Sequence, residues 1–566
     1  MAAEIEEAVP AGGADEIKPY RIHVSSKYLD LTKRKLEVTR LPREPSEPKS
    51  KDWWEPKSRI EPLIDFWLEQ YSWRAQEDLL NTELPQFRAG FSVPSSEAIV
   101  RINFVHARSS HSNAIPLLLI PPFPFSNLSF GHLIKQFTEP EDVTNCLPFH
   151  LIIPALPGLG FSDALPNNTP VISTTAQILN SLMSRLSYPY YLITNASSGV
   201  ASPAEIDFKL VNYLATHYSD SCLGAHLISP PLAQPKLREA PVEWAKWTAA
   251  SLVRAPILGY RKEDFSALKR NGFARSPKKT PSPAQVGLNQ LGLREPNTLA
   301  YALCDSPTGL LAFVLKSLCL LDPKREFTPT EVINLTQLSW LPGPEAAMRL
   351  WAHCAQYPEA DQKLRSRAKI GITVFLGDDE PGTNGDTDAE AIGLTQDEAK
   401  DRYMCPSWAK AKYDVVHVSR ATGRPGLLAW DRPEIIATGA RRLAASILRS
   451  DSRLKPADTP APALVPVEAT LERVVVQDDV AAERPSSPPT QPGPTLLAPP
   501  NGEERNQPHR EVSDETAVGS NENVAGKSPL PASRIPRLTH LAPPVDKREH
   551  PRREASDDTA VEQPNN

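Results

Sequence analysis

Short, continuous apolar runs alternate with helical stretches along the middle of this 566-residue chain. The runs are rich in Ile, Leu and Val and cover residues 98–106, 115–120, 149–154, 190–194, 225–230, 370–376 and 413–418. Helical spacing fills the intervals at 173–187 and 204–217. Runs of this kind are typical of parallel strands buried on both faces, with helices as crossovers. The pattern predicts an α/β fold with a mostly parallel, twisted sheet flanked by helices.

A long helical insertion interrupts this alternation at residues 231–350, with clear helical patterns at 299–321 and 344–356. The strand pattern then resumes, and a last helix is expected at 432–449. An α/β sheet that is interrupted by helices and then completed is the plan of a hydrolase core with a lid. Ligands bind at the carboxyl ends of such strands, so the turns there are the candidate sites.

The end of the chain has a different composition. Residues 452–566 contain no Phe, Trp, Tyr, Cys or Met, although they hold 19 of the 59 prolines. Without large apolar side chains, a segment cannot offset the entropy of ordering its backbone, so we expect a disordered Pro-rich tail. The predicted domains are a disordered N-terminus at 1–17, an N-terminal meander segment at 18–92, an α/β core formed by 93–232 and completed by 357–450, a helical lid at 233–356 inserted between these two core segments, and the tail at 451–566.

Charge and cysteine usage exclude several classes of protein. The 62 Lys and Arg are balanced by 68 Asp and Glu, which argues against nucleic acid as the main partner. The chain has no run of about 18 apolar residues, so no integral membrane span is expected. The N-terminus lacks the basic and apolar regions of a signal peptide. The six scattered cysteines fit reduced thiols. We therefore predict a cytoplasmic protein with no cofactor and no metal.

Three separated motifs stand in a fixed order along the chain. They are Tyr71–Asn81 with Leu84–Phe87, then Ala155–Ser162, then Cys304–Leu310. Together they resemble the epoxide hydrolases of the α/β-hydrolase fold, in the microsomal-type branch that has its own N-terminal domain. The resemblance covers residues 20–445 and implies an α/β-hydrolase fold with a lid over an apolar pocket.

The resemblance also implies a mechanism. An Asp carboxylate at a strand-to-helix elbow attacks an epoxide carbon and forms an ester. Two lid tyrosines bind and protonate the epoxide oxygen, and a His held by an acid activates the water that cleaves the ester. Two backbone N–H groups stabilise the oxyanion.

The nucleophile and base positions of this chain do not carry those residues. Ser197 stands at the nucleophile position within Asn195–Gly199, and Gly426 stands at the His position. A serine hydroxyl without a base is a poor nucleophile. His417 lies nine residues before Gly426, within an expected strand. We interpret it as structural, with a substitute base as the alternative.

The remaining site positions are carried over in the same way. Asp378 falls at the position of the acid, or it is a solvated carboxylate of a Gly/Asp-rich turn. Phe123 and Ser198 offer the oxyanion-binding N–H groups, although Pro121 and Pro122 beside Phe123 remove two donors.

Both lid tyrosines are replaced in this alignment. Leu288 falls at the first position and Trp351 at the second, where an indole N–H can donate a hydrogen bond but no useful proton. Tyr301 lies nearby and either compensates in part or is an aromatic of the lid helix.

These residues leave three hypotheses for function. The family implies an epoxide hydrolase-like protein, a hydrolase of ether bonds, that acts on an apolar epoxide metabolite in a secondary-metabolite pathway. The first alternative is a non-catalytic pseudoenzyme that binds a small apolar molecule or a partner. The second is a Ser197-dependent, esterase-like acyl hydrolase. In related proteins the N-terminal segment braces the lid or a dimer, so a homodimer stays open.

Overall fold

The computed structural model describes residues 16–44, 56–93, 96–143, 146–167, 169–199, 202–270, 295–322, 325–359, 367–377 and 403–454. All of them belong to the first of two compact units, Met1–Glu468. The predicted tail and most of the predicted N-terminus lie outside the described residues, so the disorder expected of them stays a prediction.

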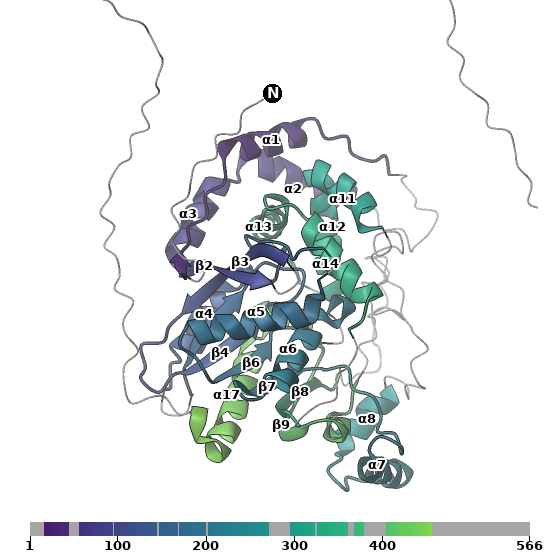
Figure 1. Ribbon diagram of the computed structural model, residues 1–566. Coiled ribbons are helices and arrows are strands. Elements are labelled where there is room, and N and C mark those ends of the chain that lie inside the picture. The colour runs from purple at the N-terminus through teal and green to yellow at the C-terminus, as the bar shows by residue number, and fades with distance from the viewer. Residues whose placement is uncertain are drawn as a thin grey trace, which may run out of the picture. The chain divides into compact units, whose positions relative to one another are not determined.

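A nine-stranded sheet forms the centre of this unit (Figure 1). Its strands, in order across the sheet, are β1 (Lys18–Pro19), β2 (Gln86–Val93), β3 (Ser96–Ala107), β5 (Phe149–Pro154), β4 (Ile115–Ile120), β6 (Tyr191–Asn195), β7 (Cys222–Ile228), β8 (Lys369–Phe375) and β9 (Asp414–Ala421). The pairs from β1 to β5 are antiparallel, and every pair from β5 to β9 is parallel. The predicted, mostly parallel α/β fold is confirmed.

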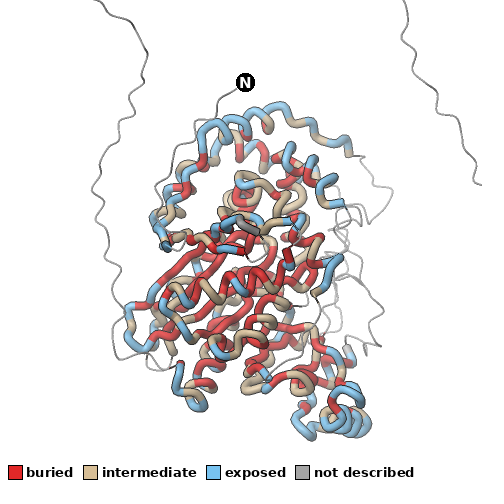
Figure 2. The backbone as a smooth tube through the Cα atoms, in the orientation of Figure 1, coloured by how far each residue is buried: buried red, intermediate tan, exposed pale blue. Residues whose placement is uncertain are grey.

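Both faces of the sheet are covered, which is why the strands are apolar throughout. On β4, Leu118 and Ile120 join the core beneath α5 (Val171–Arg185) and α6 (Ile206–His217). Leu117 and Leu119 point to the other face and join the core beneath α17 (Pro433–Ser450). This alternation follows from the two-residue period of a strand. The strands form the buried layer in Figure 2.

Side chains of the Tyr71–Asn81 motif hydrogen-bond to the backbone of residues 22–24 near the N-terminus. Helix α3 (Trp73–Glu83) follows α1 (Ser26–Glu37) and α2 (Lys57–Glu69). Glu77 and Asn81 are four residues apart and share one side of α3. The Glu77 carboxylate accepts from the Val24 N–H at 2.6 Å, and the Asn81 amide bonds both backbone groups of Ile22 at 2.7 and 2.8 Å. The motif therefore orders residues 22–24 beside α3.

The lid consists of α11 (Pro296–Asp305), α12 (Pro307–Leu321), α13 (Pro329–Trp340) and α14 (Glu345–Gln356). The helical pattern predicted at 299–321 is broken into two helices that bend by 115°. Ser306 caps α12 by accepting from the Gly309 N–H at 2.9 Å, and Pro307 occupies the first turn. Within the described ranges, no single helix is long and apolar enough to cross a membrane, whereas α11 and α12 pass that test only as a bent pair.

Helices α1 to α3 brace this lid from above (Figure 1). The Trp340 indole N–H donates to the Thr32 hydroxyl at 2.8 Å, and the Tyr71 hydroxyl donates to the Asn334 amide oxygen at 2.7 Å. Each bond joins the N-terminal segment to α13, so the lid is fixed by side chains more than 250 positions away in the chain.

Helices α7 (Pro241–Val253) and α8 (Lys262–Arg270) fall within the predicted lid range but lie elsewhere. Helix α7 packs against the short helix Pro406–Ala411, α8 is bonded to β9, and neither lines the cavity under the lid. Asp264 on α8 forms two 2.8 Å bonds with the Arg420 guanidinium of β9, and the Asp264 side chain is fully buried. The 233–356 segment thus divides into a lid proper and a separate helical hairpin.

Candidate functional site

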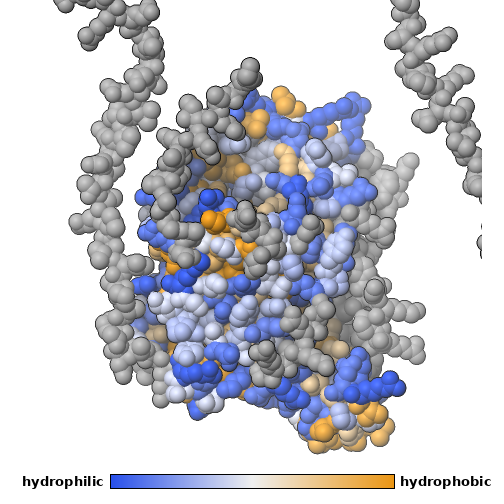
Figure 3. Space-filling view, in the orientation of Figure 1, coloured by the Kyte–Doolittle hydropathy of each residue, from blue (hydrophilic) through white to orange (hydrophobic). Residues whose placement is uncertain are grey.

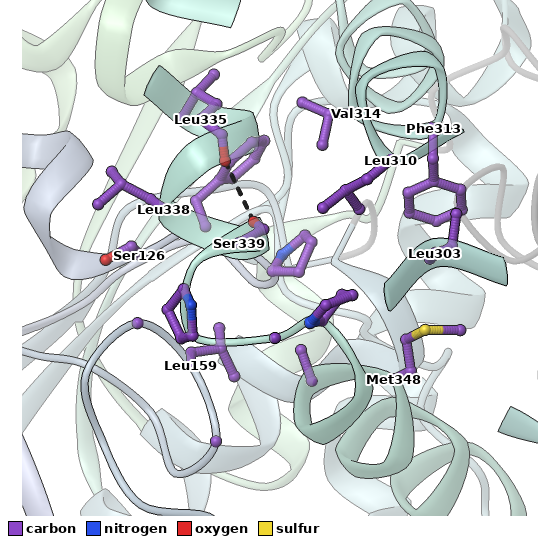
Figure 4. A pocket seen from close by; sticks show the side chains of 18 of the residues that line it. Ser126, Leu159, Leu303, Leu310, Phe313, Val314, Leu335, Leu338, Ser339 and Met348 are labelled. Carbon is purple, nitrogen blue, oxygen red and sulfur yellow. Dashed lines mark hydrogen bonds between the residues drawn. The ribbon is translucent and has the colours of Figure 1, made fainter. Parts of the chain in front are cut away.

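An apolar cavity lies where the lid meets the loops that follow β4 and β5 (Figure 4). Its volume is about 820 Å³, including the open mouth. The loop after β4 contributes residues 123–126, the loop after β5 contributes residues 158–160, and α11 to α14 contribute the remaining walls and roof. This is the carboxyl end of the parallel strands, where the sequence predicts a site.

The three serines of the cavity are already engaged within the protein. Ser317 donates to the Phe313 carbonyl at 2.8 Å, and Ser339 donates to the Leu335 carbonyl at 3.2 Å, as Figure 4 shows for Ser339. Ser126 donates to the Asn127 side-chain oxygen at 3.3 Å. The other residues that line the cavity are glycines, prolines, or aliphatic and aromatic residues, so the cavity suits an apolar small molecule.

Two glycines of the predicted 155–162 motif let the lid approach the core. Gly158 and Gly160 have φ of +78° and +51°, which non-glycine residues rarely adopt. A Cβ at Gly158 would lie 2.9 Å from the Ala346 Cβ of the lid, and one at Gly160 would lie 2.9 Å from the Ser126 Oγ. The motif therefore shapes the cavity floor by close backbone approach.

Ser197, the predicted nucleophile position, follows β6 and bonds to a carboxylate. Its hydroxyl donates to the Asp207 Oδ2 at 2.6 Å. Asp207 Oδ1 accepts from the backbone N–H of Phe123 at 3.1 Å, and the Asp207 side chain is fully buried in the first turn of α6. Phe123, predicted as an oxyanion donor, thus pairs its N–H with an internal carboxylate.

Sequence reasoning missed Asp207, although a signal was present. Asp207, Leu210, Val211 and Leu214 share the helical spacing of one face, and all four are buried. A carboxylate on the apolar face of a helix needs partners, because an unpaired buried charge costs several kcal/mol. Such a residue just after the predicted elbow is therefore a candidate partner of that elbow.

Burial raises the pKa of Asp207 to about 6, and hydrogen bonds from Ser197 and Phe123 act in the opposite direction by favouring the charged form. The group is therefore mainly ionised at neutral pH but lies close to its titration range. A carboxylate poised near neutrality is suited to accept or return a proton.

The turn that carries Ser197 differs from a strained nucleophile elbow. Such an elbow is a sharp turn from strand to helix. Here α6 begins only at Ile206, and Ser197 is not among the described residues with positive φ. Ala204 and Glu205 do have positive φ, at 51° and 57°. Among the described residues of this turn, the strained backbone thus lies directly before α6, which carries Asp207, and not at Ser197.

Asn195 holds this turn in place. Its side-chain oxygen accepts from the Ile228 N–H of β7 at 3.1 Å, and its amide group donates to the Ser197 carbonyl at 2.5 Å. The residue after Ser197 is also enclosed. Among the described residues the buried Ser198 hydroxyl has no partner.

Gly426, at the predicted His position, lies in a left-handed turn with φ +54°. A Cβ there would be 2.7 Å from the Asp322 Oδ2, so a larger side chain would displace that carboxylate. Burial is the largest effect on the neighbouring Asp431 and raises its pKa. The hydrogen bond from Arg325 lowers the pKa of Asp431 but does not offset the effect of burial. A side chain at this position would therefore need both a strained backbone and a shift of the Asp322 carboxylate.

The histidines nearest to the predicted role of a base bond to other groups. His417 sits on β9, and its Nε2 pairs with the Ser419 hydroxyl at 2.8 Å. Three strand spacings separate β9 from β6, which is about 14 Å. His226 is enclosed between the Thr194 and Thr373 hydroxyls, and burial lowers its pKa to about 3. No His among the described residues bonds to Ser197, and none belongs to a group that could hold a metal.

Trp351, at the second predicted tyrosine position, lines the cavity from α14 and is 8% exposed. Its ring lies 6.3 Å from the Phe123 ring in an edge arrangement. Its indole N–H has no partner within the described part of the chain. Tyr301 is 82% exposed and does not line the cavity. Leu288 and Asp378 lie outside the described residues.

Comparisons with known proteins identify the family. Residues 17–130 match the family model described as "Epoxide hydrolase N terminus". A "Putative epoxide hydrolase" of Stigmatella aurantiaca is 28% identical over 63% of this chain and 74% of its own length. Juvenile hormone epoxide hydrolase 1 of Ctenocephalides felis is 26% identical over 53% of this chain and 59% of its own length.

A solved structure extends the agreement to the whole fold. The juvenile hormone epoxide hydrolase of the silkworm Bombyx mori superposes with a TM-score of 0.56 at 19% identity, over 77% of this chain and 95% of the silkworm protein. That identity supports the fold alone, while the matched N-terminal domain and the relatives in sequence support the family. The chain therefore belongs to the epoxide hydrolase family of the α/β-hydrolase fold.

Proposed function

We propose that this epoxide hydrolase-like protein binds an apolar small molecule carrying an epoxide in the cavity under the lid, and that it forms no ester intermediate. Family membership supports the class of ligand, and the apolar walls support its polarity. A place in a secondary-metabolite pathway, a cytoplasmic location and a homodimer stay predictions.

The observation that carries this proposal is the pairing of Ser197 and Phe123 with Asp207. Ester formation needs an ionised carboxylate at the elbow, where this chain has a hydroxyl. Acyl transfer needs free N–H donors for an oxyanion, and the Phe123 N–H already serves Asp207. The same contact therefore argues against both the ester route and the esterase-like alternative.

Filling the cavity is expected to weaken ligand binding. Ser339→Phe adds a ring inside the cavity, so saturable binding of trans-stilbene oxide, followed by quenching of Trp fluorescence, should weaken roughly tenfold or more. The matched control is Ser266→Phe on the exposed side of α8, which should bind as the wild type does. Equal binding by both variants, or no binding by the wild type, would contradict the proposal.

The 2.6 Å bond between Ser197 and Asp207 favours a second candidate function, ring opening in one step. Ionised Asp207 accepts the Ser197 proton while Ser197 takes a proton from water, whose oxygen attacks an epoxide carbon. The ring C–O bond breaks and the resulting alkoxide takes a proton from solvent. Asp207 then returns its proton to solvent through Ser197, so the carboxylate is regenerated and the net change is addition of water. A hydroxyl of the ligand in the place of water would close a new ring.

Isotope transfer separates this route from the ester route. In ¹⁸O-labelled water, the one-step route puts label into the diol in the first turnover, whereas the ester route would first donate an unlabelled enzyme oxygen. Asp207→Asn is expected to lower any such turnover by roughly tenfold or more. An unlabelled first product, or unchanged turnover of the variant, would exclude the relay and leave binding intact.

A further inference from the structure

Helix α7 presents an apolar surface to the outside of the molecule. Among the described residues, fourteen large hydrophobic side chains are exposed, and six of these lie within residues 242–258. We call these six the α7 patch: Val242, Trp244, Leu252, Val253, Ile257 and Leu258. Single exposed hydrophobics are normal, but a cluster of this kind marks an interaction site.

The patch is the outer side of a helix whose inner side is also apolar. Val242, Ala249 and Val253 are exposed at helical spacing, and Leu252 is 84% exposed. On the opposite side, Trp247 is buried against Trp408 with ring centroids 5.3 Å apart. Figure 3 shows the outer side as an orange area at the lower right, where Figure 1 places α7. Helix α7 also carries polar residues, Glu243, Lys246, Thr248 and Ser251, but the number of exposed apolar side chains beside them indicates a second environment to contact.

The patch is held rigidly on the body. The bidentate bond between Asp264 and Arg420 joins α8 to β9, and the Tyr403 hydroxyl also donates to Asp264. Ser407 donates to the Gly259 carbonyl at 2.7 Å, directly beside the end of the patch. A buried ion pair with further hydrogen bonds fixes a geometry. The exposed residues therefore form a defined surface.

Cations border the patch. Arg254, Arg261 and Lys262 are exposed, and no carboxylate among the described residues pairs with their side chains. Arg254 directly follows Val253, and the other two lie within four residues of Leu258. An isologous contact with a second copy would bring these like charges together, which is unfavourable. An anionic surface would complement them.

We propose that the α7 patch docks the protein onto an anionic membrane surface. Trp244 and the aliphatic side chains enter the boundary between headgroups and acyl chains, while Arg254, Arg261 and Lys262 contact lipid phosphates. This combination of Trp, aliphatic residues and cations is typical of helices that lie in the interface plane. With 13 residues α7 is about 20 Å long, which suits lying on a membrane and not crossing it.

Vesicle sedimentation of the full chain tests this proposal. Wild-type protein should bind phosphatidylcholine vesicles that contain phosphatidylserine, and added salt should weaken the binding. Leu252→Glu/Val253→Glu should bind roughly tenfold or more weakly, because two charges would enter the apolar boundary. Arg254→Glu/Lys262→Glu should lose binding to phosphatidylserine vesicles in the same way. Trp244→Ala, which adds no charge, should weaken binding without altering the fold.

The matched control is Val38→Glu/Leu79→Glu, which makes the same change at two exposed aliphatic residues. Val38 directly follows α1, and Leu79 lies on α3. It should bind vesicles as the wild type does. The proposal is overturned if the wild type ignores the vesicles, or if the control loses as much binding as the patch variant. It is equally overturned if the patch variant turns a dimer into a monomer in sedimentation velocity while vesicles stay unbound.

Discussion

Ser197→Asp is expected to give no gain in epoxide hydrolysis over the wild type and to lower the free energy of unfolding by about 3 kcal/mol. The change restores the carboxylate that the family uses, so a gain of activity is the simple expectation from sequence. The structure reverses that expectation, because the Asp207 carboxylate lies 2.6 Å from the Ser197 hydroxyl. Two buried carboxylates at this separation cannot both ionise without a large cost.

The predicted loss of the base at Gly426 is a second reason to expect an inactive variant, even if it folds well. Loss of a general base costs roughly 10⁴-fold or more in enzymes that form covalent intermediates. Gly426 cannot simply be changed to His, because its φ is +54° and a Cβ would lie 2.7 Å from the Asp322 carboxylate. Adding Gly426→His to Ser197→Asp is therefore expected to give no recovery.

Two variants control this experiment. Ser197→Asn has the size of Asp without the charge and should keep near wild-type stability in urea unfolding at pH 7. Ser197→Asp/Asp207→Asn restores a single carboxylate to the pair and should regain most of the lost stability. Diol formation by Ser197→Asp above the wild-type level would refute the account of the site.

The sequence predicted the strands of this fold well, for a physical reason. The predicted runs 115–120 and 149–154 coincide with β4 and β5, because strands covered on both faces need unbroken apolar side chains. The boundaries of the predicted helices were less accurate. The pattern at 299–321 hid a 115° bend, which the Ser306 cap and Pro307 explain in retrospect.

Tertiary proximity is what the sequence could not show. Asp207 is an ordinary residue for the first turn of a helix, because a negative charge there favours the helix dipole. Only the fold brings it to Ser197 and to the Phe123 N–H, which come from two different strand ends. In the same way, nothing in residues 241–253 indicates which side of α7 faces the core. Asp378 and Leu288 lie outside the described residues, so their predicted roles stay predictions.

Ser197 and Phe123, two predicted site positions, share one partner, the Asp207 carboxylate. In the predicted alignment Ser197 stands at the position of a charged residue, and its hydroxyl donates to a carboxylate, Asp207, of the neighbouring helix. The Phe123 N–H keeps an anionic partner, now supplied by the protein itself. Positive φ is found at Ala204 and Glu205, the two residues before α6. The structure thus has one carboxylate beside the predicted oxyanion loop, and helix α6 carries it.

Asp207→Asn is expected to flatten the dependence of stability on pH. Burial raises the pKa of Asp207 to about 6 in the folded protein, above its ordinary value of 3.8. The folded state therefore binds more protons than the unfolded state between these values, so stability is highest below the window and falls as pH rises through it. The difference between the two pKa values corresponds to about 3 kcal/mol over the whole titration, of which about 2 kcal/mol is lost between pH 4 and pH 7.

Urea unfolding at several pH values measures this effect. From pH 4 to pH 7 the free energy of unfolding should fall by about 2 kcal/mol less in Asp207→Asn than in the wild type, since the other titrating groups are common to both. The Asn side chain can still accept from the Phe123 N–H and donate to Ser197, so the fold is kept. Ser197→Ala is the matched variant. It removes a hydrogen bond that lowers the pKa of Asp207, so its loss of stability should extend to higher pH. Parallel pH curves for all three proteins would show that Asp207 is not the buried, ionised partner of Ser197.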